Sequence, residues 1–123
     1  DIKIFADVHV KHGSHSIVAD RSLEDQTYDN VFFDADVLIA TGSRTGNETE
    51  LAEIHGIKEH TQLPVIVGSG MTAENAEKIM AVADGCIVGT SLKEDGKWWN
   101  PIDEKRAKEF MEKVNQIPVK GEV

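Results

Sequence analysis

Two polar residues at the end of a short strand could carry acid–base chemistry. Residues 2–8 alternate between apolar and polar types, which predicts a strand with one face against covering helices. Asp7 and His9 share the other face, about 6–7 Å apart. An Asp so placed can orient the imidazole and leave its other nitrogen for proton transfer. Lys11 adds an amine able to contact phosphate or form a Schiff base. These three are the candidate catalytic residues; alternatively, Asp7 pairs with Lys3 or Lys11 and only satisfies its own burial.

A histidine run continues from the same strand. His9, His12 and His15 follow an H-x-x-H-x-x-H spacing. Imidazole is a common zinc ligand, and three ligands can build a catalytic metal site. This run falls in a stretch rich in Ser and Gly with no Cys beside it, where histidines are more often solvated. We therefore expect no metal here and predict no cofactor.

Two consecutive strands end in the same kind of turn, in which glycines stand beside hydroxyl side chains. The turns are Gly68, Ser69 and Gly70 after one strand, and Gly89, Thr90 and Ser91 after the next. Glycine lets backbone N–H groups approach an anion closely, hydroxyls add donors, and a helix beginning near Thr72 adds positive potential. This pattern predicts a phosphate site. The alternative is that both turns need glycine for their geometry alone.

Side chains in other loops are further candidates for ligand contacts. Arg44, flanked by glycines, could clamp a second anionic group, or it could simply be solvated. Trp98, followed by Trp99, could stack on a ligand at the mouth of the fold. The interpretation we favour is that both rings pack against neighbouring helices. Cys86 lies inside an apolar strand and is expected in the core.

The elements that must position these residues alternate regularly along the chain. Strands are expected at 2–8, 37–41, 65–68 and 86–89, and helices at 23–33, 51–58, 72–83 and 105–116. The core is expected from their apolar residues: Ile4, Phe5, Val37, Leu38, Ile39, Leu51, Ile54, Val65, Ile66, Val67, Ile79, Met80, Ile87, Val88 and Phe110. Units of about 30 residues predict an α/β fold with a parallel sheet. Four units form a small doubly wound sheet or half of a (β/α)8 barrel, since a complete barrel takes roughly 250 residues. No sequence repeat is evident between the units.

Several segments resemble the BtpA family of TIM-barrel proteins. The resemblance is carried by residues 4–12, 19–22, 41–46, 67–75, 83–93 and 95–103. It implies that residues 1–117 are the C-terminal half of a TIM-type (β/α)8 barrel, strands five to eight, with 118–123 as a tail. It also implies that the two glycine turns are the phosphate-binding loops after strands seven and eight. The family is named for a factor in photosystem I biogenesis and also occurs in organisms without photosynthesis.

Composition and charge narrow the classes of function. The chain has 123 residues, 40% of them hydrophobic, and a formal net charge of −9 without a run of Lys or Arg. This argues against general nucleic-acid binding and adhesion to anionic membranes. No apolar run approaches the ~20 residues of a spanning helix, so no membrane insertion is expected. A single Cys forms no internal disulfide, which favours a reducing compartment: the cytoplasm, or an organelle matrix or stroma. The start at Asp1, without a leader, favours an excised or processed piece.

Two functions from different classes follow as hypotheses. In the first, the protein binds a phosphorylated small molecule at the carboxyl ends of its strands, with or without catalysis. In the second, it is a non-catalytic assembly or stability factor for a membrane protein complex and uses the barrel as a protein-binding scaffold. Half a barrel has two free strand edges. The chain is therefore not expected to persist as a monomer, and the expected partners are a second copy or the missing N-terminal half.

Overall fold

Strands and helices alternate throughout the part of the chain that the structure describes. The computed structural model describes residues 1–9, 20–41 and 48–118. In chain order the elements are β1 (Phe5–Asp7), α1 (Leu23–Phe32), β2 (Val37–Ala40), α2 (Glu48–Lys58), β3 (Val65–Val67), α3 (Ala76–Met80), β4 (Gly85–Cys86), the 3-10 helices η1 (Thr90–Leu92) and η2 (Glu94–Gly96), and α4 (Glu104–Asn115). The expected order is confirmed, although the strands are shorter than expected. None of the helices in these residues is long and apolar enough to cross a membrane.

The strands form one parallel sheet in the order β1-β2-β3-β4. Asp7 lies opposite Ile39, Ile39 opposite Ile66, and Ile66 opposite Gly85. Each strand thus neighbours the next one along the chain. Doubly wound sheets reverse their strand order at a switch point, whereas consecutive units of a (β/α)8 barrel do not. The α/β fold is confirmed, and the strand order agrees with half of a barrel.

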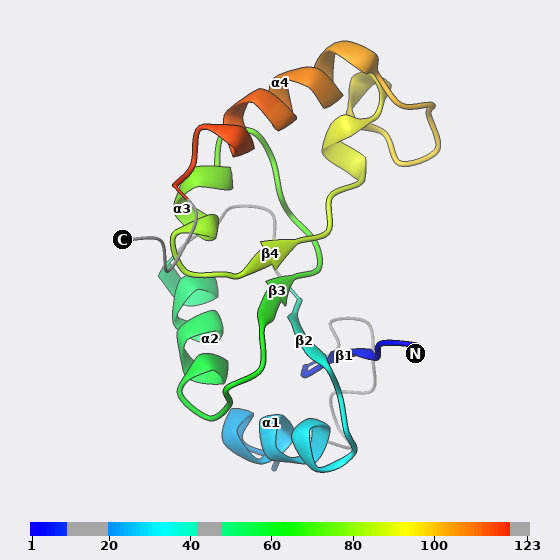
Figure 1. Cartoon of the computed structure of the whole chain (residues 1–123). Helices are drawn as coiled ribbons and strands as arrows, with labels where there is room; N and C mark the ends of the chain where they lie inside the picture. The colour runs from blue at the N-terminus through cyan, green and yellow to red at the C-terminus, as the bar shows by residue number, and fades with distance from the viewer. Residues whose placement is uncertain (10–19, 42–47, 119–123) are drawn as a thin grey trace.

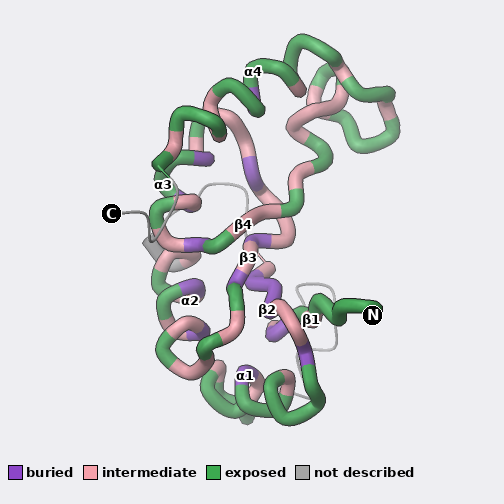
Figure 2. The backbone as a smooth tube through the Cα atoms, in the orientation of Figure 1, coloured by how far each residue is buried: buried purple, intermediate pink, exposed green. Residues whose placement is uncertain are grey.

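The core lies between one face of the sheet and the helices. Helices α2 and α3 lie on the same side of the strands (Figure 1). Leu38, Val65 and Val67 point to that side, and each is at most 2% exposed. They form one cluster with Ile57 of α2 and Ile79 of α3. Buried segments, purple in Figure 2, occur on the strands and on both helices. Alternate strand residues therefore hold the helices against the sheet.

The predicted core is right on the helix side and wrong at the edges of the sheet. The buried members are Leu38, Ile39, Ile54, Val65, Val67, Ile79 and Phe110. Leu51, Met80 and Val88 are partly buried and pack against them. Ile4, Phe5 and Ile87 are instead 51%, 54% and 49% exposed. Phe5 and Ile87 alternate with helix-facing neighbours, so they point to the sheet face that no described helix covers.

Exposed large apolar side chains occur only in the first and last units of the described chain. One group surrounds β1 and α1: Ile2, Ile4, Phe5, Tyr28, Val31, Phe32 and Phe33. The other follows β4: Ile87, Trp98, Trp99, Ile102 and Met111. The described residues between 34 and 86 contain none. Both ends of the sheet thus carry apolar surface.

One contact occurs twice in the structure, although the sequence shows no repeat. Asp36, just before β2, accepts a hydrogen bond from the Ile4 N–H through Oδ2 at 2.8 Å, and its own N–H donates to the Ile4 carbonyl at 2.8 Å. Asp84, just before β4, makes the same pair of bonds with Val65, at 2.9 and 2.8 Å. Lys58 Nζ lies 3.0 Å from Asp84 Oδ1. We call these two contacts the aspartate clamps; each joins the starts of two neighbouring strands.

Candidate functional site

The two glycine turns meet at the carboxyl ends of β3 and β4. The hydroxyl of Ser91, in the turn after β4, donates to the carbonyl of Met71, which follows the turn after β3, at 2.7 Å. Met71 is itself buried, so this bond anchors the second turn to the core. The expected proximity of the turns is therefore present. That they bind phosphate stays a prediction.

The three glycines of these turns serve different physical needs. A Cβ on Gly68 would stand 2.6 Å from Ile39 Cγ2, so this position has no room for a side chain. Gly70 has a φ of 79°, in the left-handed region that favours glycine. At Gly89 a Cβ would meet no described atom within 4 Å. Packing explains Gly68 and geometry explains Gly70, whereas Gly89 borders open space.

The start of α3 offers fewer free donors than expected. The Thr72 N–H donates to Asn75 Oδ1 at 2.8 Å, and the Asn75 N–H donates back to Thr72 Oγ1 at 3.2 Å. This is the reciprocal bonding of a capping box. The helix proper begins only at Ala76 and has five residues. The sequence predicts a helix that begins near Thr72, whereas the helix begins at Ala76 and the N–H groups of Thr72 and Asn75 are already paired.

The turn after β4 keeps its donors and gains a cation. Gly89 and Thr90 are exposed, and η1 begins at Thr90, where the first N–H groups of a helix lack partners within it. Arg106 of α4 reaches back to this turn, with Nη1 donating to the Ser91 carbonyl at 3.2 Å. The sequence did not single out Arg106, because nothing in its spacing separates it from the other cations of α4.

Trp98 and Trp99 form an exposed aromatic pair. Their side chains are 71% and 64% exposed, and the rings meet edge to face with centroids 5.6 Å apart. Lys97 Nζ lies 5.8 Å from the centroid of the Trp99 ring. The favoured expectation that both rings pack against neighbouring helices is wrong, because they remain largely exposed and pack on each other. A ligand contact by Trp98 stays a prediction.

At the end of β1, His9 has an acidic neighbour that the sequence did not suggest. Asp7 is exposed, and His9, two residues on, is half-buried. Burial raises the pKa of the Glu53 carboxyl on α2, the nearby His9 lowers it, and Glu50 raises it. His9 therefore lies close enough to Glu53 for their charges to interact. A direct contact between Asp7 and His9 stays a prediction.

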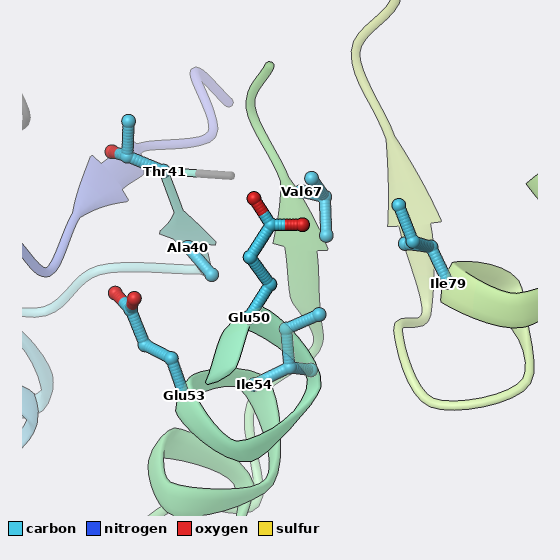
Figure 3. Close-up of a pocket in the computed structure, with 7 residues that line it drawn as sticks. All are labelled: Ala40, Thr41, Glu50, Glu53, Ile54, Val67 and Ile79. Carbon is cyan, nitrogen blue, oxygen red and sulfur yellow. The ribbon is translucent and has the colours of Figure 1, made fainter. Parts of the chain in front are cut away.

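Glu50 and Glu53 both project from α2 toward the carboxyl ends of β2 and β3 (Figure 3). They line a small pocket whose other residues are Ala40, Thr41, Ile54, Val67 and Ile79. The two carboxylates and the Thr41 hydroxyl supply its polar atoms, and aliphatic side chains supply the rest. Carboxylates in such a setting can exchange protons with a neighbouring histidine. The sequence signal that could have revealed them is their i, i+3 spacing on a helix that follows a strand end.

Four other sequence candidates lie outside the described residues: Lys11, His12, His15 and Arg44. Among the residues that are described, no group of three or more His, Cys, Asp or Glu side chains could hold a metal ion. Cys86 is half-buried and packs against the core, as expected. Burial raises the pKa of its thiol, which lowers the share of reactive thiolate at neutral pH.

Strand order and helix placement define an α/β protein with one parallel sheet, and its polar candidates lie at the carboxyl ends of the strands. The model of the BtpA family matches residues 1–116. The chain belongs to the BtpA family. The resemblance seen in the sequence is thereby confirmed.

Relatives occur in very different organisms. The chain is 43% identical over 116 residues to Uncharacterized protein MJ1115 of Methanocaldococcus jannaschii, covering 94% of this chain and 43% of that protein. It is 38% identical over 117 residues to Uncharacterized protein F13E9.13, mitochondrial, of Caenorhabditis elegans, covering 95% and 42%. It is 36% identical over 83 residues to Putative sgc region protein SgcQ of Escherichia coli, covering 67% and 31%. The chain spans less than half the length of these relatives.

Proposed function

We propose that the protein binds a phosphorylated small molecule at the carboxyl ends of β3 and β4. The observation that carries this proposal is the bond from Ser91 to Met71, which holds the two glycine turns together. The open space at Gly89 supports it, since an anion can approach the backbone there closely.

The donors come mainly from the turn after β4. The N–H groups of Thr90 and Ser91 open η1, and the exposed Thr90 hydroxyl adds a further donor. Arg106, bonded to the Ser91 carbonyl, brings positive charge to the same turn. Because the whole chain carries a charge of −9, an anion needs such local groups to bind.

Reaction of the bound molecule would use the acid–base groups at the end of β1. Asp7 and His9 remain the proposed pair, with Lys11 as a further amine. Glu53 joins them, because its carboxyl group interacts with His9. The proposed compartment is a reducing one, the cytoplasm or an organelle matrix or stroma, in which the thiol of Cys86 stays free.

The second candidate function is that of a non-catalytic assembly or stability factor for a membrane protein complex. Its supporting observation is the exposed pair of Trp98 and Trp99. Tryptophan is enriched among the residues that dominate protein–protein binding energy. Under this proposal the pair, rather than the glycine turns, is the principal binding surface.

A thermal-shift screen with inorganic phosphate, sugar phosphates and nucleotides separates the two candidates. A phosphorylated ligand should raise the midpoint of unfolding, by linkage between binding and folding. Arg106→Gln should weaken that ligand about tenfold, because a charge-assisted donor is lost. Lys108→Gln is the matched control: Lys108 lies on the same helix and pairs with Glu104, as Arg106 pairs with Asp103, but only Arg106 also donates to the turn at Ser91. Equal effects of the two variants would place the site elsewhere, and no shift with any phosphate would favour the second function.

A further inference from the structure

We propose that Asp95 is a site of spontaneous isomerisation, at which the backbone converts to an isoaspartyl linkage. The chain contains two Asp–Gly pairs, Asp84–Gly85 and Asp95–Gly96. In such a pair the glycine has no side chain that would keep its backbone nitrogen away from the aspartyl carboxyl group. The two pairs differ in structure, because hydrogen bonds hold the carboxylate of the first pair, whereas that of the second is exposed.

The reaction needs no partner other than water. The Gly96 nitrogen attacks Cγ of Asp95, a C–N bond forms, and the carboxyl hydroxyl leaves as water with the amide hydrogen. Because both groups belong to one dipeptide, this closure of a cyclic imide is intramolecular. Water then opens the ring at one of its carbonyl groups. Opening at the side-chain carbonyl restores aspartate, whereas opening at the main-chain carbonyl gives the isoaspartyl linkage, in which Cβ is part of the backbone.

Asp95 lies in the short turn η2 and is exposed, and no described residue bonds to its carboxylate. Its φ of 55° lies in the left-handed region, which is unfavourable for a residue with a Cβ. The Gly96 N–H donates to the Lys93 carbonyl at 3.0 Å, and the Lys97 N–H donates to the Glu94 carbonyl at 3.2 Å. These bonds belong to a three-residue 3-10 helix, whose hydrogen-bond geometry is poorer than that of an α-helix. The turn should therefore open readily enough for ring closure.

Asp84 is held by its aspartate clamp. Its Oδ2 accepts from the Val65 N–H at 2.9 Å, and Lys58 Nζ lies 3.0 Å from its Oδ1. The backbone is held as well, since the Asp84 N–H donates to the Val65 carbonyl and Gly85 begins β4. Attack by the Gly85 nitrogen would require the carboxylate to leave both partners. Because bonds to charged groups are costly to leave unmade, we expect isomerisation at Asp84 to be slower by about tenfold or more.

Isomerisation at Asp95 would also disturb the turn proposed to bind an anion. The backbone between Asp95 and Gly96 becomes one carbon longer. A Cβ on Gly96 would stand 3.6 Å from Arg106 Nη1, the atom that donates to the Ser91 carbonyl. The isoaspartyl form should therefore bind a phosphorylated ligand about tenfold more weakly, as Arg106→Gln does. This consequence rests on the proposed function, whereas the modification itself does not.

Incubation in water enriched in heavy oxygen measures the reaction, because each ring opening places one solvent oxygen in the product. Cleavage after Lys93 puts the two Asp–Gly pairs in different peptides, whose label is read by mass spectrometry. The folded chain should take up label at Asp95 and at least about tenfold less at Asp84. In concentrated urea, where the clamp is lost, both pairs should take up label at similar rates. No label at Asp95, equal label at both pairs in the folded chain, or the same preference in urea would overturn the proposal.

Two substitutions at the same position test the ring itself. Asp95→Asn forms the same imide with ammonia as the leaving group and should take up label faster, whereas Asp95→Glu would need a larger ring and should take up none. Label in Asp95→Glu equal to that of the unaltered chain would overturn the proposal. Chromatography separates the isoaspartyl form from fresh protein for calorimetry with a phosphorylated ligand. Equal affinity of the two forms would contradict the link to the anion turn, and binding by neither form would contradict the proposed function; in both cases the modification stands.

Discussion

Ile39 reaches over Gly68, so that its Cγ2 atom stands 2.6 Å from the place where a Cβ on Gly68 would be. Ile66 stands over Gly85 in the same way, at 3.1 Å. Both isoleucines belong to the sheet face that no described helix covers, and each lies beside a glycine. Gly68, just after β3, therefore has a packing role whether or not its turn binds an anion.

Gly68→Ala should lower the free energy of unfolding by ~1–3 kcal/mol, because the new methyl group has no room beside Ile39. Ile39→Ala removes the Cγ2 atom at its own cost of ~2–5 kcal/mol. In the double variant, Gly68→Ala should add little further cost. Urea unfolding of all four proteins measures this coupling. Strictly additive losses would show that the two side chains do not compete for the same space.

Glu53→Gln should stabilise the protein near neutral pH. Since burial raises the pKa of Glu53, the folded state holds this proton more tightly than the unfolded chain. The protonated carboxyl therefore contributes its whole share to the free energy of unfolding at pH values below the ordinary pKa of Glu. This contribution is lost as the pH rises through the raised pKa that Glu53 has in the folded state. The neutral amide avoids that loss, so the midpoint of unfolding should rise by roughly 1–3 °C near pH 7, a modest gain because the group is half-exposed.

The same substitution should have little effect at about pH 3.5, where Glu53 is protonated in both states. Glu59→Gln, exposed just after α2, is the control and should change nothing at either pH. Carbon NMR of the carboxyl group gives an independent check. His9→Gln should raise the pKa of Glu53 further, and Glu50→Gln should lower it. If the pKa of Glu53 instead fell in His9→Gln and rose in Glu50→Gln, His9 and Glu53 would not belong to one site.

Asp84→Asn should cost ~1–3 kcal/mol of unfolding free energy, because its charged acceptor serves both the Val65 N–H and Lys58. Asp36→Asn should cost less, since its ion pair with Lys3 is long, at 3.9 Å, and more exposed. Asp95→Asn is the control, because Asp95 is exposed and has a φ of 55° that Asn tolerates. Denaturant titrations measure the free energy of unfolding of the three variants. If Asp84→Asn and Asp95→Asn lost equal amounts, the clamp at Asp84 would not be a stabilising contact.

Gly89→Val should abolish binding of any phosphorylated ligand found in the screen and leave most of the fold intact. A Cβ at this position meets no described atom within 4 Å, so a side chain has open space there and should cover the backbone without disturbing the core. Calorimetry gives the affinity, and circular dichroism confirms the fold. Ala81→Val, at an exposed position just after α3, is the control. Unchanged affinity in Gly89→Val would exclude this turn from the site.

Periodicity was enough to predict the order of the elements. In the structure, the Ser22 hydroxyl accepts a hydrogen bond from Asp25 N–H at 3.0 Å and the Asp103 carboxylate caps α4, so polar side chains mark the starts of two of the helices. Apolar runs located the strands but not their lengths or their exposed faces. Phe5 and Ile87 have the composition of core residues, yet burial also depends on what lies opposite, which a local pattern does not contain.

Part of the candidate site could likewise be predicted from local sequence patterns, and part could not. Glycine and hydroxyl patterns identified the turns at Gly68 and Gly89 correctly as neighbours, because consecutive parallel strands end on one side. The sequence did not predict two interactions between distant segments: Arg106 donates to the Ser91 carbonyl, 15 positions away, and the charge of His9 lowers the pKa of Glu53. Such pairings depend on tertiary packing, for which spacing along the chain gives no signal.

The aspartate clamps and the glycine turns occupy opposite ends of the strands. Asp36 and Asp84 precede β2 and β4, whereas Gly70 and Gly89 follow β3 and β4. Substitutions in the turns can therefore change the proposed binding site while the contacts that secure the strand starts stay unchanged. Such a separation leaves the exposed turn position Gly89 free to vary, whereas Gly68 stays constrained by its packing against Ile39. New specificities could then evolve on this scaffold by changes in the turns, without a compensating change in the clamps.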